Sequence, residues 1–109
     1  MESKRTIKEL FEKVDKVYFY LPDDETKKSF AENADREGFV YRGSVRTRDR
    51  KPNGVMSIDK NGIICVIGMQ GNVIMRHFAE GDRFDNILCI DYKKYISSDD
   101  DYYFKGYYK

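Results

Sequence analysis

The stretch KVYFYL, residues 16–21, is the strongest indication of the fold in this chain of 109 residues. Its β-branched and aromatic residues favour a strand, and Pro22 ends that strand. Because apolar side chains fall on both of its faces, we expect the strand to lie in the interior of a sheet. Asp23 follows as a helix N-cap with acidic residues after it, and the helix is predicted to run to about Glu37, just before Gly38.

The chain on either side of this unit adds a second helix and several strands. Upstream, Thr6 and Glu9 form a capping box, and the apolar spacing after them predicts a short amphipathic helix over residues 6–15. Downstream, β-rich segments predict strands over residues 39–45, 54–59, 62–68, 73–78 and 86–91, with turns at 59–62 and 68–72. We therefore expect an α+β fold in which two N-terminal helices pack on a mainly antiparallel sheet of about five strands.

The composition of the chain changes near residue 97. A polar segment, residues 97–101, precedes an aromatic one, and six of the nine tyrosines fall between Tyr92 and the last residue. The length favours one domain, which we expect to span residues 1–96, with residues 97–109 as a tyrosine-rich C-terminal tail. Two interpretations of this tail are open: a stacking or docking surface, and a segment that folds back over an exposed sheet face.

The charge balance excludes a strong overall attraction to nucleic acid or membranes. The net charge is +1, from 20 Lys and Arg against 19 Asp and Glu, so any such attraction must be local. The longest apolar run, residues 63–67, is too short to cross a bilayer, and the N-terminal residues lack the apolar segment of a signal peptide. Cys65 and Cys89 lie in apolar runs, so we expect two buried thiols in the reducing cytoplasm rather than a disulfide or a metal site.

Few patterns in the sequence indicate catalysis. The chain has one histidine, His77, and no phosphate-binding loop, metal-ligand motif or nucleophile motif. Asp91-Tyr92-Lys93 matches half of a metal-dependent nuclease motif, but no second acidic motif accompanies it. The turn at residues 68–72 could hold an anion, although an ordinary β-turn explains it better. We therefore expect a protein that is not an enzyme, with no catalytic residues, no metal and no cofactor.

The candidate binding residues centre on a basic stretch, residues 42–51, which holds five basic residues and one acid. Arg46, Arg48 and Arg50 alternate, so in an extended chain they project to one side. Such a row could bind phosphates, or the acidic groove of a protein that itself binds nucleic acid; it could equally be a solvated loop. The candidate partner-binding residues are Tyr41, Arg42, Arg46, Arg48, Arg50, Lys51, Tyr102 and Tyr103.

Three segments together resemble small accessory proteins carried by phages and mobile elements of Gram-positive bacteria. They are VYFYLPDDETKKSFAENADREGF (residues 17–39), a hairpin ending in VIG (residues 66–68), and IDYKKYI (residues 90–96). The basic stretch at residues 42–51 departs from that pattern. The resemblance implies a non-enzymatic protein that inhibits or regulates a host protein, such as an anti-CRISPR-like or other anti-defence protein. It assigns no catalytic residue.

Three functional classes fit the sequence. We expect first a cytoplasmic inhibitor that binds one host protein directly, whose partner could be a nucleic-acid-binding defence effector. The second is a sponge that sequesters a nucleotide or cyclic nucleotide, with a pocket formed between the copies of a homo-oligomer. The third is an RNA- or DNA-binding module, which a net charge of +1 disfavours.

Overall fold

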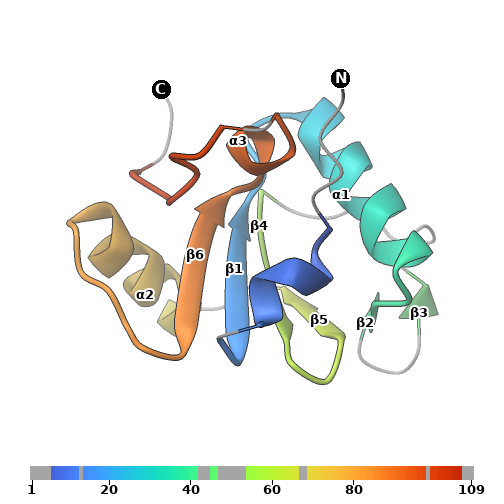
Figure 1. Cartoon of the computed structure of the whole chain (residues 1–109), viewed down its shortest axis with the longest axis horizontal. Helices are drawn as coiled ribbons and strands as arrows, with labels where there is room; N and C mark the ends of the chain where they lie inside the picture. Colours follow the sequence, from blue (N-terminus) through green and yellow to red (C-terminus); the bar gives the residue numbers. More distant parts are fainter. Residues whose placement is uncertain are drawn as a thin grey trace.

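The computed structural model describes residues 6–12, 14–41, 45–46, 54–66, 69–97 and 99–106. These residues form an α+β structure around one mixed sheet with the strand order β3-β2-β5-β4-β1-β6 (Figure 1). The strands are β1 (Lys16–Tyr20), β2 (Val40–Tyr41), β3 (Val45–Arg46), β4 (Val55–Asp59), β5 (Ile63–Val66) and β6 (Ile87–Asp91). The helical segments are the 3₁₀ turn η1 (Lys8–Phe11) and the helices α1 (Asp24–Arg36), α2 (Met69–Ala79) and α3 (Tyr92–Ile96).

β1 lies in the interior of the sheet, as its apolar pattern predicted. It pairs antiparallel with β4 on one side and parallel with β6 on the other, so that Phe19 is opposite both Met56 and Ile90. Phe19 belongs to one hydrophobic cluster, whereas Tyr18 and Tyr20 belong to another, because successive side chains of a strand point to opposite faces. The strand therefore supplies core residues to both faces of the sheet.

The prediction of a mainly antiparallel sheet is wrong, because the sheet is mixed. The predicted hairpin is present as β4 and β5, and the strand predicted over residues 39–45 is two short strands, β2 and β3; both pairs are antiparallel. β1 with β6, and β2 with β5, are parallel. These parallel partners lie far apart in the chain. A sequence pattern indicates which faces of a strand are buried. It does not indicate which distant strand pairs with that strand.

α1 begins and ends where its sequence signals predicted. The Asp23 carboxylate accepts a hydrogen bond from the backbone N–H of Thr26 at 2.7 Å, which is the geometry of an N-cap. Gly38 follows the helix with a φ of 89°, a left-handed conformation that glycine adopts without strain. By contrast, the helix predicted over residues 6–15 is only the 3₁₀ turn η1.

The C-terminal end of α1 holds η1 in place. The Glu37 carboxylate accepts hydrogen bonds from the backbone N–H groups of Ile7 at 2.9 Å and Lys8 at 3.0 Å. The Thr6 hydroxyl accepts the N–H of Glu9 at 3.3 Å, so the threonine part of the predicted capping box is present. The N–H groups at the start of a helical turn need such partners. Here the carboxylate comes from 30 residues away in the chain.

α2 replaces a predicted strand and most of a predicted turn. The strand predicted at residues 73–78 is wrong, and residues 69–72, predicted as part of a turn, belong to the same helix. The β-branched residues of this segment indicated a strand. The buried residues, however, are Met75 and Phe78, which are 0 % and 1 % exposed, whereas Val73 is 45 % exposed. Two buried residues three positions apart fit the period of a helix. The burial of these residues against the sheet outweighs the local preference for a strand.

α3 was not predicted, and it begins directly after β6. The Asp91 carboxylate accepts a hydrogen bond from the N–H of Lys94 at 3.4 Å and so caps this short helix. Because α2 and α3 lie in the second half of the chain, the prediction of two N-terminal helices on the sheet is wrong.

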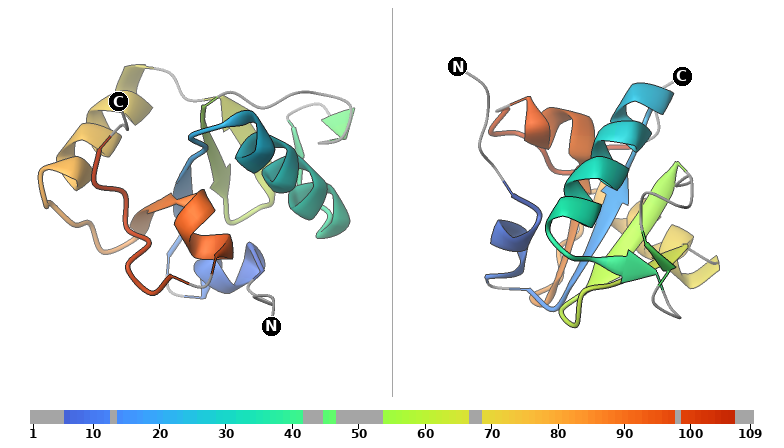
Figure 2. Two further views of the ribbon diagram at one scale, coloured as in Figure 1. Left: turned by 90° about the horizontal axis from the view of Figure 1, so that it is seen from above. Right: turned by 90° about the vertical axis from the view of Figure 1, so that its right-hand side faces the viewer.

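Helical segments cover both faces of the sheet (Figure 2). η1, α1 and α3 pack on one face, where Phe19, Phe30 and Tyr92 pack ring against ring. α2 packs on the opposite face, where Phe78 shares a cluster with Tyr18. The molecule therefore has two hydrophobic clusters separated by the sheet, and β1 contributes to each of them.

Residues 99–106 of the predicted tail fold back along β6. The N–H of Asp91 donates to the carbonyl of Tyr102 at 2.7 Å, and the N–H of Phe104 donates to the carbonyl of Cys89 at 3.0 Å. Phe104 is 1 % exposed. These residues fold back, but they pair along the edge of β6 instead of lying over a sheet face. They cover backbone groups of β6 that would otherwise be unpaired.

Asp23 joins the start of α1 to α3. The N–H and the hydroxyl of Thr26 each donate to its carboxylate at 2.7 Å, and the Lys93 ammonium donates at 2.9 Å. Hydrogen bonds from Thr26, and then from Lys93, lower the pKa of Asp23 from 3.8 to about 2. Because folding lowers the pKa of Asp23, the charged carboxylate stabilises the folded protein fully above pH 3.8. This stabilisation is lost as the pH falls toward 2.

We expect Asp23→Asn to reduce the loss of stability between pH 3.8 and about 2, because asparagine can cap a helix but does not titrate. Urea unfolding followed by circular dichroism across this pH range measures the effect. The matched control is Asp24→Asn, which removes the adjacent exposed carboxylate without removing the cap, so the difference between the two variants isolates the effect of the cap. An Asp23→Asn profile parallel to that of the wild type would contradict the role assigned to Asp23.

Candidate functional site

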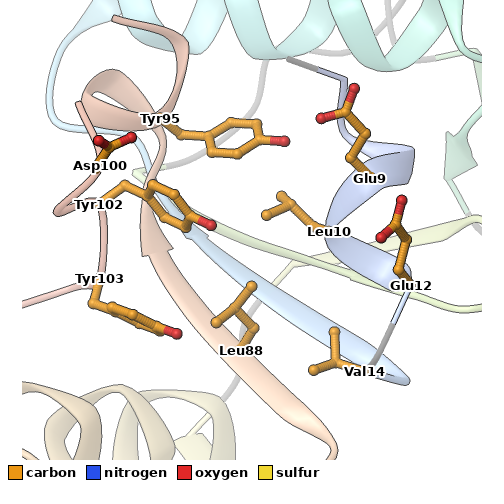
Figure 3. Close-up of a pocket in the computed structure, with 9 residues that line it drawn as sticks. All are labelled: Glu9, Leu10, Glu12, Val14, Leu88, Tyr95, Asp100, Tyr102 and Tyr103. Carbon is orange, nitrogen blue, oxygen red and sulfur yellow. The ribbon is translucent and has the colours of Figure 1, made fainter. Parts of the chain in front are cut away.

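The C-terminal segment and η1 border a cleft of about 500 Å³ beside β6 (Figure 3). Its lining comes from η1 and the residues after it, from β6, from α3 and from the C-terminal segment. The lining residues are Glu9, Leu10, Glu12, Val14, Leu88, Tyr95, Asp100, Tyr102 and Tyr103. We call this cavity the tyrosine cleft.

Three tyrosine rings form one side of the tyrosine cleft. The Tyr95 hydroxyl donates a hydrogen bond to the carbonyl of Thr6 at 2.6 Å, which ties α3 to the chain just before η1. The Tyr102 ring packs edge-on against Tyr95 with centroids 5.0 Å apart, and it stacks on Tyr103 at 5.8 Å. Such ring pairs have preferred geometries. The aromatic side of the cleft is therefore oriented by its own internal contacts.

Leu10, Val14 and Leu88 form the apolar floor of the tyrosine cleft (Figure 3). Leu10 is buried within the hydrophobic cluster on the α1 face, and Val14 and Leu88 are partly buried against that cluster. The floor is thus continuous with the core, while part of its surface stays open. An apolar base with a few polar groups around it is the usual composition of a ligand site.

Three acidic residues belong to the lining of the tyrosine cleft. Glu9 and Glu12 extend from the η1 side, and Asp100 lies on the opposite side of the cleft beside Tyr102 (Figure 3). All three acids are exposed. Among the described residues that line the cleft, there is no lysine, arginine or histidine. The cleft therefore attracts cations and repels phosphates.

The ring of Tyr103 already contacts one cation, on the α2 side. The guanidinium carbon of Arg83 lies 4.9 Å from the centroid of the Tyr103 ring and 5.4 Å from that of Phe78. Its Nη1 donates hydrogen bonds to the carbonyls of Phe78 at 3.1 Å and Asp82 at 2.6 Å. Arg83 therefore holds the Tyr103 ring in place through a cation–π contact.

The structure places the predicted binding residues in different parts of the molecule. Tyr102 and Tyr103 line the tyrosine cleft. Tyr41 is 2 % exposed and belongs to the cluster on the α1 face, so its ring offers no binding surface. The backbone of Arg46 lies in β3, at the opposite end of the sheet from β6, and its side chain is outside the described part of the structure. Also outside the described residues are Arg42, Arg48, Arg50 and Lys51.

Most residues of the tyrosine cleft were not predicted from the sequence. The residues missed are Glu9, Leu10, Glu12, Val14, Leu88, Tyr95 and Asp100. The density of tyrosines after Tyr92 was a usable signal for Tyr95. No local signal could bring η1 to the other side of the cleft, because the hydrogen bond between Thr6 and Tyr95 joins residues 89 apart in the chain.

The other residues that were considered as candidates in the sequence lie outside the tyrosine cleft. Asp91, from the half-motif of a nuclease, is 2 % exposed and serves as the cap of α3. Cys89 is buried as predicted, and burial raises the pKa of its thiol. Cys65 is partly exposed, and both cysteines are free. His77 lies near the exposed end of α2 and not on a strand.

No family model, no curated protein and no solved structure matches this chain. Within the described ranges, no helix has the length and apolar character needed to cross a membrane.

Proposed function

We propose that this chain is a small, non-enzymatic cytoplasmic protein that binds a partner protein directly and holds a lysine or arginine side chain of that partner in the tyrosine cleft. The observation that carries the proposal is the combination of three carboxylates and three tyrosine rings around one cavity. Tyrosine faces attract cations. Carboxylates accept short, charge-assisted hydrogen bonds from ammonium and guanidinium groups.

A long basic side chain fits both parts of the tyrosine cleft. Its aliphatic stem can lie on the apolar floor while its charged head reaches the carboxylates. Because Glu9, Glu12 and Asp100 are exposed, the head group keeps part of its hydration and the cost of desolvation is small. Contacts of this kind contribute more to specificity and to the rate of association than to raw affinity.

A host protein that binds nucleic acid is the partner class that best fits this charge pattern. Such proteins expose lysine and arginine side chains to contact phosphates, and the carboxylates of the cleft can engage the same groups. The more specific form of the proposal is an inhibitor of a nucleic-acid-binding defence effector, in the manner of an anti-CRISPR-like protein. The resemblance of residues 17–39 and 90–96 to accessory proteins of phages and mobile elements supports that form.

The tyrosine cleft does not favour the other two functional classes. A nucleotide and a nucleic acid both present phosphates, which Glu9, Glu12 and Asp100 repel. A nucleotide sponge or an RNA- or DNA-binding module would have to use the basic stretch at residues 42–51, most of which lies outside the described residues.

We expect the double substitution Glu9→Gln/Glu12→Gln to weaken the binding of a labelled oligoarginine peptide by about tenfold, because each exposed carboxylate contributes on the order of 0.5–1 kcal/mol to an ion pair. Fluorescence anisotropy at low ionic strength measures the dissociation constants. The matched control is Glu25→Gln/Glu32→Gln on α1, which removes the same charge from exposed positions away from the cleft. Equal weakening by both pairs would show a general charge effect and contradict the assignment of the cleft.

The same proteins test the partner class. Tagged wild type and the α1 control should each capture one protein in stoichiometric amount from a nuclease-treated bacterial lysate, and the cleft variant should not. If all three proteins capture no protein partner but capture a nucleotide from this lysate, or nucleic acid from an untreated lysate, one of the two alternatives replaces this proposal.

A further inference from the structure

Three potential metal ligands meet at the C-terminal end of α2. They are the imidazole of His77 and the carboxylates of Glu80 and Asp82, all of them exposed, with ligand atoms that lie within 4.8 Å of one another. His77 Nδ1 and Asp82 Oδ2 are 2.9 Å apart. We propose that these three side chains form a binding site for a divalent transition-metal ion of the Zn²⁺ type. The site is separate from the tyrosine cleft and does not depend on the function proposed for it.

The backbone of the turn after α2 fixes the positions of these ligands. The N–H of Gly81 donates to the carbonyl of Phe78 at 3.1 Å, and the N–H of Asp82 donates to the carbonyl of His77 at 2.9 Å. Together with the φ of 102° at Gly81, these two bonds form the Schellman pattern that closes a helix at a left-handed glycine. The chain reverses at this point, so Asp82 returns to lie beside His77, with Glu80 on the turn between them.

Neighbouring aromatic and basic side chains support this arrangement. The ring of Phe84 packs edge-on against that of His77, with centroids 6.2 Å apart, and so restricts the orientation of the imidazole. The guanidinium of Arg83 donates to two backbone carbonyls and lies over the rings of Phe78 and Tyr103. The charge of Arg83 is therefore directed to these carbonyls and rings. The ligand atoms of His77, Glu80 and Asp82 remain close to one another.

The ligand set indicates the class of metal. One imidazole with two carboxylates suits Zn²⁺ and the neighbouring transition metals, whereas Mg²⁺ and Ca²⁺ prefer sites made of oxygen atoms alone. Metal–ligand bonds of about 2.0–2.2 Å require ligand atoms no more than about 4.4 Å apart. Exposed side chains can close the present separation by small rotations. Three protein ligands also leave a position for water or for a group on another molecule.

The single histidine of the chain makes this site directly observable. Because His77 is the only histidine, the imidazole proton signals in the NMR spectrum of the untagged protein report on this residue alone. We expect Zn²⁺ to shift these signals in a saturable one-to-one titration, and Mg²⁺ at the same concentration to leave them unchanged. The absence of a saturable Zn²⁺ shift would overturn the proposal and leave an ordinary histidine–aspartate pair.

Two substitutions distinguish a three-ligand site from a lone imidazole. Glu80→Gln and Asp82→Asn should each weaken Zn²⁺ binding by at least about tenfold, since even the partners that only orient a ligand contribute that much. Isothermal titration calorimetry measures the affinities. Asp85→Asn, an exposed acid in the same connection, is the matched control and should bind Zn²⁺ like the wild type. Undiminished Zn²⁺ binding in both Glu80→Gln and Asp82→Asn would overturn the assignment.

Discussion

Replacement of Phe19 by alanine is expected to lower the free energy of unfolding by about 3–5 kcal/mol, a large part of the 5–15 kcal/mol that stabilises a typical small domain. Phe19 is 0 % exposed and lies in β1 between β4 and β6. Its ring centroid is 5.1 Å from that of Phe30 in α1 and 5.7 Å from that of Tyr92 in α3. The substitution therefore leaves a cavity where two helices meet the centre of the sheet.

Urea unfolding followed by circular dichroism gives the size of the Phe19 effect. Phe19→Leu keeps most of the apolar volume and should lose clearly less stability than Phe19→Ala. Val73→Ala, at a position that is 45 % exposed on α2, is the control and should unfold close to the wild type. A loss below about 1 kcal/mol for Phe19→Ala, the size expected for an average substitution, would contradict the central position of this ring.

Replacement of Phe104 by alanine is expected to lower the free energy of unfolding by about 3 kcal/mol, although Phe104 lies in the segment that was predicted to be a tail. Phe104 is 1 % exposed, and its ring lies edge-on to Tyr20 with centroids 5.2 Å apart. It belongs to the cluster on the α2 face together with Met75 and Phe78. That cluster is small, so the loss of one ring removes a substantial part of its buried area.

The same unfolding experiment separates a structural segment from an attached tail. The control is Lys105→Ala, which changes the exposed neighbour of Phe104 and should leave the midpoint of unfolding unchanged. If Phe104→Ala unfolds at the wild-type midpoint, the packing of the C-terminal segment through this ring is contradicted, and with it the position of Tyr102 and Tyr103 in the tyrosine cleft.

Much of the local structure could be predicted because its signals lie within a few residues of one another. The β-branched and aromatic run of β1, the Asp23 cap of α1 and the turn between β4 and β5 each depend on short segments. α2 could not be predicted in this way. Its β-branched residues favour a strand in isolation, and the helix is selected by the burial of Met75 and Phe78 against the sheet.

The candidate site was predicted only in part. Tyr102 and Tyr103 were found because the density of tyrosine near the C-terminus is visible in the composition. Glu9 was predicted only as part of a capping box, and Glu12 only as a charged residue of the predicted N-terminal helix. Their position across the cleft depends on the Thr6–Tyr95 hydrogen bond and on the Glu37 carboxylate that holds η1. Neither interaction has a pattern in the sequence, because each joins segments far apart in the chain.

By itself, the sequence determined the α+β class, the interior position of β1, the limits of α1 and the β4–β5 hairpin. Those features follow from side-chain alternation, caps and turns, which act between near neighbours. Only the tertiary structure decided the parallel pairing of β1 with β6, the helical state of α2, the burial of Phe104, and the meeting of acids and tyrosines in one cleft. These features depend on contacts between distant segments, and the burial gained there outweighs local conformational preference.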